Sequence, residues 1–433
     1  MNLRKVTAQQ VAEQAGLSGE QMAALLSDGG APVPDEVFSA CAAALRVEPG
    51  QLSTNTEPDL TVVLQSAQEL RDTCRPIQRD GIHFYNYYSM AAPAGRVSPV
   101  ILDILCPPDR LPALNNGHLE PAITVNLGPG DIHGRWGENL SEATWQVLEA
   151  NRDTDRWITG DSYVEPSYCP HSYSLAGAEA ARIVSYTGQS NLVPLVEELN
   201  TWSEPAFANF LDALPERTEP AALLELLLAR RCYDTAGAAA AAGITEAGVK
   251  QILTDPFGSL PEMRALGSAL GFDYRLLLPP ERRHDPVGKT WTSVAEGRRT
   301  QRDFRGYRVA SMASAPHLSD LSGTFLQVET AAGEHGGDLV EANESHYLVI
   351  SGAPVLSWQD QDGAWQSAGL EVDASAWAGP FVRHRWSGTG SVLRFGSGSR
   401  AGYLDLFELT NTFAVAATAR RSRRDTRGWG YDS

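Results

Sequence analysis

Apolar residues recur at helical spacing in two separate parts of the chain. Residues 7–26, TAQQVAEQAGLSGEQMAALL, predict two short helices joined at Gly16, with Ser18 and Gln21 as a capping box. A third helix is expected in PVPDEVFSACAAALRV. The pattern returns in YDTAGAAAAAGITEAGVKQIL and LPEMRALGSALGF, where Gly243 takes the place of Gly16. We therefore predict a duplicated three-helix module of the helix-turn-helix kind, with further helices over residues 192–231.

Alternation of apolar and polar residues indicates strands after each helical module. The clearest runs are AITVNLG, SHYLVISGAPVLSW and SVLRFGSG, which Gly and Pro residues bound. YYSMA at residues 87–91 is answered by VASMA at residues 309–313. The predicted fold class is mixed α and β, with two β-barrels in tandem and a helical module before each. The expected parts are a helical module at 1–60, a barrel at 61–205, a second helical module at 206–290, a second barrel at 291–416 and a disordered tail at 417–433.

Composition narrows the class of protein. The chain has 433 residues, of which 42% are hydrophobic, so more than one domain is expected. No apolar run follows the start MNLRK, and no segment approaches the roughly 18 apolar residues of a membrane span, so we expect a cytoplasmic protein that binds no membrane. The five cysteines form no C-x-x-C pair, which argues against a disulfide framework and a thiolate zinc site.

Charge argues against a nucleic-acid partner. The formal net charge is −18, whereas binding to phosphate backbones requires Lys and Arg. A helix-turn-helix module joined to a barrel would suit a transcriptional regulator, and that is the alternative class of function. However, residues 1–60 hold three basic residues against eight acidic ones, and the segment SGEQMAALL has no Arg or Lys. We therefore expect no DNA binding.

Two histidines stand in segments that resemble the two motifs of a cupin barrel. HLEPAITVNLGPG supplies His118 on a predicted strand, with a Gly-rich turn after it, and GDSYVEPSYCPH supplies His171. Two histidines and one carboxylate on one face of an octahedral metal leave three positions open for substrate and O₂. The carboxylate stays open between Glu120, which would share the strand face of His118, and Glu165, which would approach from the partner strand. A cupin without metal, with a structural role only, is the third possibility.

The wider pattern resembles the tandem-cupin family of 2-hydroxyethylphosphonate dioxygenases and methylphosphonate synthases, over essentially the whole chain. The family pattern N-x-x-H followed by E-x5-H is matched by Asn115, His118, Glu165 and His171. The resemblance implies Fe(II) as the cofactor, with His118, Glu165 and His171 as its ligands. Glu120 is then a residue at the rim of the barrel.

The resemblance also implies a phosphonate site. Its matched residues are Lys5, Arg79, Tyr87, Asn115 and Ser185, and Tyr87, Asn115 and Glu165 are the expected catalytic residues. A phosphonate near neutral pH carries up to two negative charges and offers acceptor oxygens. A guanidinium, an ammonium and neutral donors are the groups that recognise it.

The implied activity is cleavage of the C1–C2 bond of 2-hydroxyethylphosphonate by O₂, giving hydroxymethylphosphonate and formate in phosphonate antibiotic biosynthesis. Methylphosphonate synthase is the alternative, but it has Gln where this chain has Glu165. A homo-oligomer is expected. In the second barrel, alignment on Gly352 and Gly128 places Ala342 opposite His118 and Ala378 opposite Glu165. Only His384 then stands opposite a ligand, His171, so we predict a structural second barrel and one iron per chain.

Overall fold

The computed structural model describes residues 6–26, 33–45, 61–79, 81–93, 97–188, 192–213, 220–278, 285–318, 321–397, 408–412 and 414–422. These residues fall into two compact units, one from 1–60, 93–96 and 399–433 and the other from 61–92 and 97–398. No helix in the described ranges is long and apolar enough to cross a membrane.

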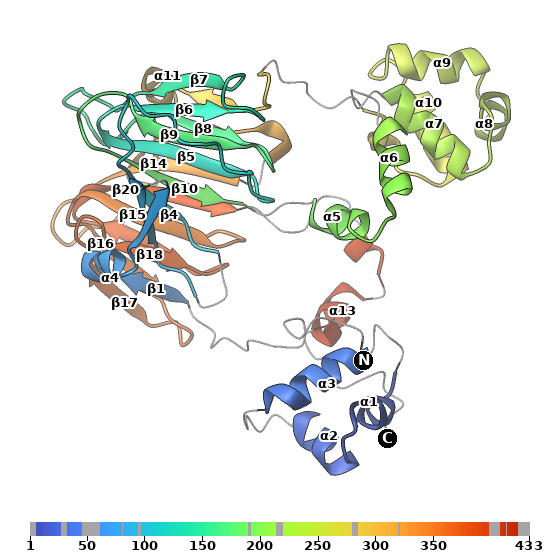
Figure 1. Ribbon diagram of the computed structural model, residues 1–433, viewed down its shortest axis with the longest axis horizontal. Helices are drawn as coiled ribbons and strands as arrows, with labels where there is room; N and C mark the ends of the chain where they lie inside the picture. Colours follow the sequence, from blue (N-terminus) through green and yellow to red (C-terminus); the bar gives the residue numbers. More distant parts are fainter. Residues whose placement is uncertain are drawn as a thin grey trace. The chain divides into compact units, whose positions relative to one another are not determined.

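The first unit holds the N-terminal helices α1 (Ala8–Ala15), α2 (Gly19–Leu26) and α3 (Asp35–Leu45), together with α13 (Val415–Ser422) (Figure 1). Helix α1 ends at Gly16, whose left-handed φ of +69° suits a residue without a Cβ. The predicted capping box is confirmed, because the Gln21 backbone N–H donates to Ser18 Oγ at 3.1 Å and the Ser18 N–H donates to Gln21 Oε1 at 2.8 Å. Helices α1, α2 and α3 lie where the sequence pattern places them.

The second helical region follows the first set of strands. It consists of α5 (Val193–Leu199), α6 (Glu204–Ala213), α7 (Pro220–Arg230), α8 (Thr235–Ala242), α9 (Glu246–Thr254), α10 (Leu260–Leu270) and the 3₁₀-helix η3 (Tyr274–Leu277). Like α1, helix α8 has eight residues and ends at a left-handed glycine, Gly243, with φ +65°. Ile252, Met263 and Leu266 are fully buried in its core. The predicted duplication is therefore visible in the backbone.

The first sheet pair joins a seven-stranded sheet, in the order β11-β8-β5-β10-β4-β3-β2, to a three-stranded sheet, β7-β6-β9. Ile132 and Trp136 from the smaller sheet share one core with Tyr163 and Ile183 from the larger sheet. A short helix, α4 (Ala67–Asp72), precedes these strands. The strands are β2 (Arg75–Arg79), β3 (Ile82–Ser89), β4 (Val100–Ile104), β5 (Ala122–Pro129), β6 (Ile132–Trp136), β7 (Thr144–Leu148), β8 (Ser162–Glu165), β9 (His171–Leu175), β10 (Ala181–Thr187) and β11 (Thr290–Thr292).

The second sheet pair repeats this plan, with a seven-stranded sheet in the order β1-β18-β15-β20-β14-β13-β12 and a three-stranded sheet, β17-β16-β19. The helix α11 (Val294–Arg299) and the 3₁₀-helix η4 (Pro316–Leu318) accompany it. Its strands are β1 (Val62–Gln65), β12 (Arg302–Phe304), β13 (Tyr307–Ser311), β14 (Leu321–Glu329), β15 (Ser345–Gly352), β16 (Val355–Gln359), β17 (Trp365–Gly369), β18 (Ser375–Ala378), β19 (His384–Ser387) and β20 (Thr389–Ser397). The predicted fold class, mixed α and β with two strand-rich halves, is confirmed.

The first strand of each half pairs with a strand of the other half. Strand β1 pairs with β18 of the second sheet pair, and β11 pairs with β8 of the first. The two halves also share a core, in which Ile123 and Val184 pack with Leu348 and Phe395. Strand pairing therefore does not follow a simple head-to-tail division of the chain. The expected boundaries at 61–205 and 291–416 stay a prediction.

Candidate metal centre

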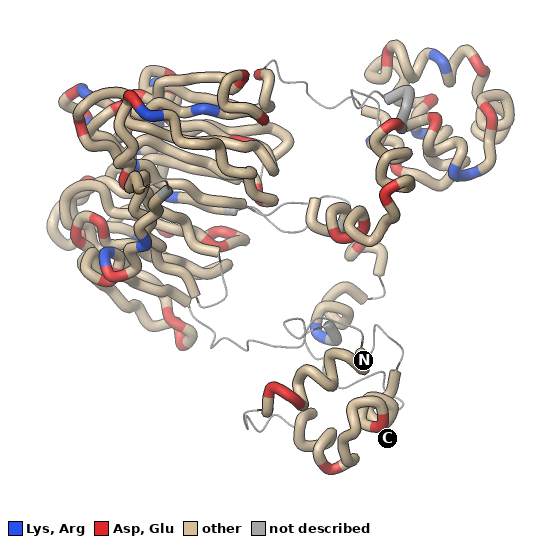
Figure 2. The backbone as a smooth tube through the Cα atoms, in the orientation of Figure 1, with Lys and Arg blue, Asp and Glu red and all other residues tan. Residues whose placement is uncertain are grey.

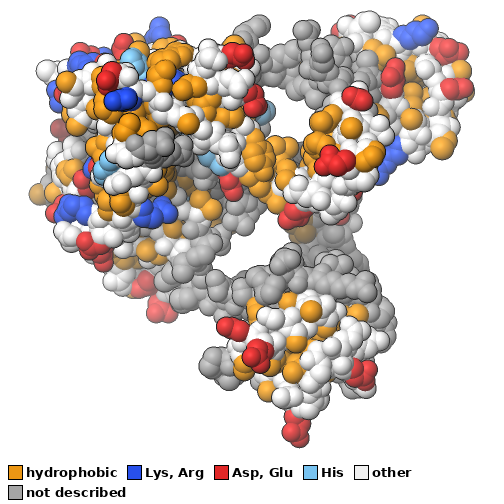
Figure 3. Space-filling model, in the orientation of Figure 1, with side chains coloured by type: hydrophobic (Ala, Val, Ile, Leu, Met, Phe, Trp, Pro, Cys, Tyr) orange, Lys and Arg blue, Asp and Glu red, His pale blue; other side chains and the backbone are white. Residues whose placement is uncertain are grey.

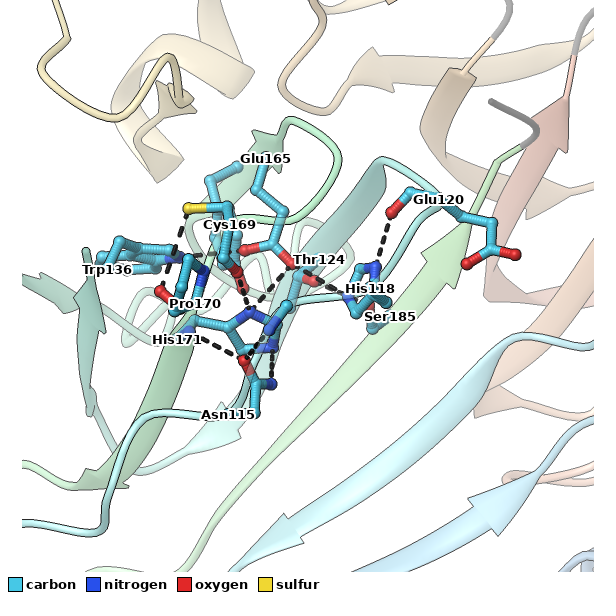
Figure 4. A network of polar contacts seen from close by, with 12 residues as sticks. Asn115, His118, Glu120, Thr124, Trp136, Glu165, Cys169, Pro170, His171 and Ser185 are labelled. Carbon is cyan, nitrogen blue, oxygen red and sulfur yellow. Dashed lines mark hydrogen bonds and ion pairs between the residues drawn. The ribbon is translucent and has the colours of Figure 1, made fainter. Parts of the chain in front are cut away.

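Three potential metal ligands converge at one end of the first sheet pair (Figure 4). Glu165 Oε1 lies 3.3 Å from His118 Nε2 and 3.4 Å from His171 Nδ1. One potential ligand atom from each residue lies within 4.8 Å of the others. Among the described residues, these three form the group of His, Cys, Asp or Glu side chains that is spaced to hold a metal ion. Glu165 is only 1% exposed and His171 9%. A buried carboxylate between two imidazoles suits a divalent cation.

Two strand pairings bring these residues together. Glu165 ends β8 and lies opposite Ala122, the first residue of β5, so the loop before β5 passes close to it. His171 begins β9, where it lies opposite Trp136 of β6. The turn between β8 and β9 crosses from the large sheet to the small one, and the Tyr168 N–H in this turn donates to the His118 carbonyl at 2.6 Å.

His118 lies in the loop before β5, so its prediction as a strand residue is wrong. Gly117, next to it, has φ +70°, and a Cβ there would lie 2.5 Å from the Tyr168 carbonyl carbon. The loop therefore leaves the strand conformation in order to pack against the β8–β9 turn. Glu120 does not share a strand face with His118 for the same reason, and Figure 4 shows its carboxylate directed away from His171 and Glu165.

Hydrogen bonds from the Nδ1 atoms to backbone carbonyls set the tautomers of both histidines. His118 Nδ1 donates to the Glu120 carbonyl at 2.5 Å, and His171 Nδ1 donates to the Cys169 carbonyl at 2.9 Å. His171 Nε2 accepts from Asn115 Nδ2 at 2.9 Å, because Asn115 Oδ1 already accepts two backbone N–H groups. The His118 Nε2 lone pair is therefore available to a cation, whereas the His171 Nε2 lone pair becomes available once the Asn115 amide releases it. Backbone carbonyls orient both rings.

The electrostatics of the cluster also favour a cation. The hydrogen bond to Glu165 is the main cause that raises the pKa of His118. In the described residues, the ion-pair partners of the Glu165 carboxylate are the two histidines. A carboxylate that favours positive charge on a neighbouring imidazole also favours a divalent cation between them, so the residues present fit a metal ion.

The other predicted site residues lie on the same large sheet, on strands at increasing distance from β8. Ser185 lies on β10, where its Oγ accepts from Thr124 Oγ1 at 2.9 Å. Tyr87, half-buried on β3, packs edge-on against the ring of Tyr85 at 6.1 Å. Arg79 is the last residue of β2 and pairs with Ile82. Lys5 lies outside the described residues. The structure therefore joins Asn115 directly to the metal cluster and places Ser185, Tyr87 and Arg79 on β10, β3 and β2 of the same sheet.

The sequence of this chain is similar to those of known proteins. The sequence profile of the family described as "2-hydroxyethylphosphonate dioxygenase cupin-like domain" matches residues 71–188. The chain is also 58% identical to the 2-hydroxyethylphosphonate dioxygenase of Streptomyces viridochromogenes over 435 aligned positions, which cover 100% of this chain and 98% of that protein. This chain belongs to the 2-hydroxyethylphosphonate dioxygenase family.

Solved structures agree with membership of the dioxygenase family. The structure of PhpD with cadmium, complexed with hydroethylphosphonate (HEP), is 56% identical, covers 98% of this chain and 97% of its own, and superposes with a TM-score of 0.81. Streptomyces albus 2-hydroxyethylphosphonate dioxygenase with its substrate and Fe(II) bound is 21% identical, covers 97% of this chain and 94% of its own, and has a TM-score of 0.77. The second structure shows that the fold persists at low sequence identity.

In this family member, the described residues of the second sheet pair contain no such metal cluster. Ser345 pairs with Ala378 as Ala122 pairs with Glu165, so the predicted correspondence of Ala378 to Glu165 is confirmed. His384 pairs with Trp358 as His171 pairs with Trp136, which confirms that correspondence too. Of the counterparts of Glu165 and His171, only His384 is therefore a potential metal ligand.

The strand register corrects the third correspondence. Four residues before Ser345 is Glu341, whereas the alignment on glycines chose Ala342 as the counterpart of His118. Glu341 forms an ion pair with Arg394. His384 Nε2 accepts from the Tyr347 hydroxyl at 2.6 Å, and its Nδ1 donates to the Val382 carbonyl. These groups satisfy one another and leave no cluster like that of the first half in the described ranges.

A cavity of about 1030 Å³ lies elsewhere, between the two sheet pairs. Its lining includes Arg152 and Arg182 from the first half and Asp373 from the second, but none of the three clustered ligands. Arg182 is held by Asp103 at 2.6 Å and by Asp373 at 3.2 Å. Arg182 thus joins Asp103 of the first half to Asp373 of the second half at this cavity.

One residue of the metal centre was missed by sequence reasoning. Trp136 is fully buried, and its Nε1–H donates to Glu165 Oε2 at 3.1 Å. Trp136 is the last residue of the segment GDIHGRW. The strand pattern of this segment predicts only that Trp136 faces a core. No spacing rule connects it to a carboxylate that follows 29 positions later.

Proposed function

We propose that this chain is a 2-hydroxyethylphosphonate dioxygenase that uses Fe(II) and O₂ to cleave the C1–C2 bond of its substrate. The products are hydroxymethylphosphonate and formate. Every atom of substrate and O₂ appears in these products, and the electrons that reduce O₂ come from the two substrate carbons, so no second reductant is needed. The observation that supports this most strongly is the buried cluster of two histidines and a glutamate in a chain 58% identical to a 2-hydroxyethylphosphonate dioxygenase.

His118, Glu165 and His171 are the proposed ligands of the iron. Their ligand atoms are His118 Nε2, one ring nitrogen of His171 and the Glu165 oxygen that faces both rings. When bound, iron(II) supplies a Lewis acid for substrate oxygens and one-electron chemistry with O₂. The chain's own contribution is to hold two imidazoles and one carboxylate together before metal and substrate arrive, which reduces the reorganisation needed for binding.

The proposed phosphonate site consists of Lys5, Arg79, Tyr87, Asn115 and Ser185. Asn115 has the best-defined role among the described residues. Its Oδ1 accepts the backbone N–H groups of Gly117 and His171, and one N–H of its Nδ2 group donates to His171 Nε2, so the second Nδ2 N–H can donate to a substrate oxygen. We propose that Asn115 and Tyr87 orient the substrate beside the ligand Glu165, while the two basic residues neutralise its charge.

The alternative of a DNA-binding regulator has less support. The described residues of α1, α2 and α3 include no Lys or Arg, and four of them are acidic: Glu13, Glu20, Asp35 and Glu36. Figure 2 shows these acidic positions along the three helices, and the face of the unit visible in Figure 3 carries acidic and apolar side chains. Such a surface repels phosphate groups.

The test is turnover watched by phosphorus NMR. The protein is loaded anaerobically with Fe(II), its metal content is measured, and O₂ and 2-hydroxyethylphosphonate are added. Hydroxymethylphosphonate together with formate is the expected result, and His171→Ala should give neither product. Methylphosphonate as the main product would identify a methylphosphonate synthase instead. A loaded protein that leaves the substrate unchanged would contradict both activities.

We further propose a role in phosphonate antibiotic biosynthesis and a homo-oligomeric state. A carbon–phosphorus bond survives the reaction, so the product can serve as a shorter phosphonate building block. Light scattering on the purified protein would measure the oligomeric state directly. A monomer at micromolar concentration would contradict that part of the proposal.

A further inference from the structure

The two oxygens of Glu165 have different surroundings. Oε1 faces the two histidines, at 3.3 Å from His118 Nε2 and 3.4 Å from His171 Nδ1. Oε2 accepts the indole N–H of Trp136 at 3.1 Å (Figure 4). Because Glu165 is 1% exposed, water does not compete for Oε2, and the hydrogen bond to it is costly to break.

We propose that Trp136, supported by Lys289, is a positioning residue that restricts Glu165 to binding the metal through one oxygen. The inference rests on the proposed iron site. If Glu165 bound through one oxygen, an octahedral metal with two histidines would keep three open positions, whereas binding through both oxygens would leave two. A substrate that chelates through its hydroxyl and a phosphonate oxygen, together with O₂, requires all three.

The indole is itself held firmly. Its ring packs edge-on against Tyr163, with centroids 5.0 Å apart, and against Tyr173 at 6.5 Å. Gly134 lies directly against it, because a Cβ at that position would be 2.1 Å from the Trp136 Cη2 atom. Trp136 therefore has no room for another orientation, and its N–H stays aimed at Glu165.

Lys289 acts on the face of the same indole. Its ammonium nitrogen lies 4.9 Å from the ring centroid, and the residue is only 8% exposed. Hydrogen bonds to Gln146 Oε1 at 2.7 Å and Asp285 Oδ2 at 3.2 Å hold it there. A cation over the face of an indole draws electron density from the ring, which makes the N–H a stronger donor to the carboxylate.

Lys289 comes from the second half of the chain, directly before β11. That strand pairs with β8, and Thr290 lies opposite Val164, the residue before Glu165. The segment thus pairs with β8, the strand that carries Glu165. It also places the Lys289 ammonium over the Trp136 indole, which donates to Glu165. The strand exchange between the halves gives the second half a direct part in the metal centre.

The experiment counts the water molecules on the metal without relying on turnover. Mn(II) is bound to the protein in place of iron, and the relaxation of water protons measures how many waters the ion holds. Trp136→Phe keeps the ring and removes the N–H. Because the released Oε2 would occupy one of three open positions, the inner-sphere relaxivity per bound Mn(II) should fall by about one third. Lys289→Met should lower it in the same direction by a smaller amount.

The matched control is Trp386→Phe in the second sheet pair. Trp386 is as fully buried as Trp136, but within the described structure its indole nitrogen has no hydrogen-bond partner, so its loss should leave the relaxivity unchanged. Wild-type relaxivity in Trp136→Phe would overturn the proposal. If that variant does not fold by circular dichroism, wild-type relaxivity in Lys289→Met would overturn it instead. Failure of the wild type to bind Mn(II) or Fe(II) would contradict the iron site itself, which is a separate outcome.

Steady-state kinetics supplies a second readout. If Trp136 preserves a position for the substrate, Trp136→Phe should raise KM for 2-hydroxyethylphosphonate by a larger factor than it lowers kcat. A purely structural role for Trp136 would instead reduce the amount of folded enzyme, with KM unchanged for the remaining fraction. Unchanged KM with lowered kcat in Trp136→Phe would therefore also overturn the proposal.

Discussion

Replacement of His384 by Gln should make the stability of the protein less sensitive to acid. His384 sits where the first sheet pair has a metal ligand, but it is 1% exposed and accepts a hydrogen bond from the Tyr347 hydroxyl. Burial lowers the pKa of His384 from 6.5 to about 4, since the protonated ring would lose its hydration. Between these pH values the unfolded chain binds a proton at this position and the folded chain does not.

This difference in proton binding sets the sign and the size of the change in the free energy of unfolding with pH. The stability that His384 contributes is present above pH 6.5 and is lost as the pH falls toward 4, because protons then favour the unfolded state. At 1.36 kcal/mol per pKa unit, the loss is about 2 kcal/mol at pH 5 and approaches about 3 kcal/mol below pH 4. His346, whose pKa burial also lowers to about 4, is present in both proteins and cancels in the comparison.

The assay is the free energy of unfolding by denaturant at pH 8 and pH 5, with the same metal loading in every sample. We expect the wild type to lose about 2 kcal/mol more than His384→Gln over this range. Tyr347→Phe is the control: it removes a hydrogen bond worth about 1 kcal/mol at both pH values but keeps the titrating ring, so it should retain the wild-type pH dependence. Equal losses for the wild type and His384→Gln would refute the reasoning.

Further predictions concern the metal and the substrate. His171→Ala should reduce bound metal from one per chain to nearly none by elemental analysis, while His384→Ala should keep one; two metals per wild-type chain would contradict the assignment. Gly117→Ala should weaken metal binding about tenfold or more in a chelator competition, because its left-handed φ of +70° and its contact with the β8–β9 turn leave no room for a Cβ. Gly177→Ala, where a Cβ meets open space, is its control and should bind metal normally. Arg79→Ala should weaken anaerobic calorimetric binding of 2-hydroxyethylphosphonate by about 1.5 to 3 kcal/mol per lost charge-assisted hydrogen bond, with unchanged metal content; loss of metal would show a structural role instead.

Local patterns in the sequence predict the elements well where short-range physics decides them. The capping box of Ser18 and Gln21, the helix ends at Gly16 and Gly243 and the repeated helices depend on residues within a few positions of each other. The cluster of His118, Glu165 and His171 was predicted as well, but through the resemblance. Residue patterns alone left the carboxylate open between Glu165 and Glu120.

Tertiary structure decided what depends on contacts between distant segments. His118 leaves the strand conformation because its loop packs on the β8–β9 turn, which no pattern around residue 118 reports. The register of β15 makes Glu341, and not Ala342, the counterpart of His118. Pairing between strands sets this correspondence, and the match between glycines does not.

The sequence by itself determined the helical modules, the alternating strands and the chemical groups that a metal and a phosphonate require. It could not determine that β1 and β11 cross between the halves, or that Lys289 reaches an indole that binds Glu165. These features arise from pairing and packing over separations of more than a hundred residues. Because many segments have suitable alternation, only the folded arrangement selects which of them meet.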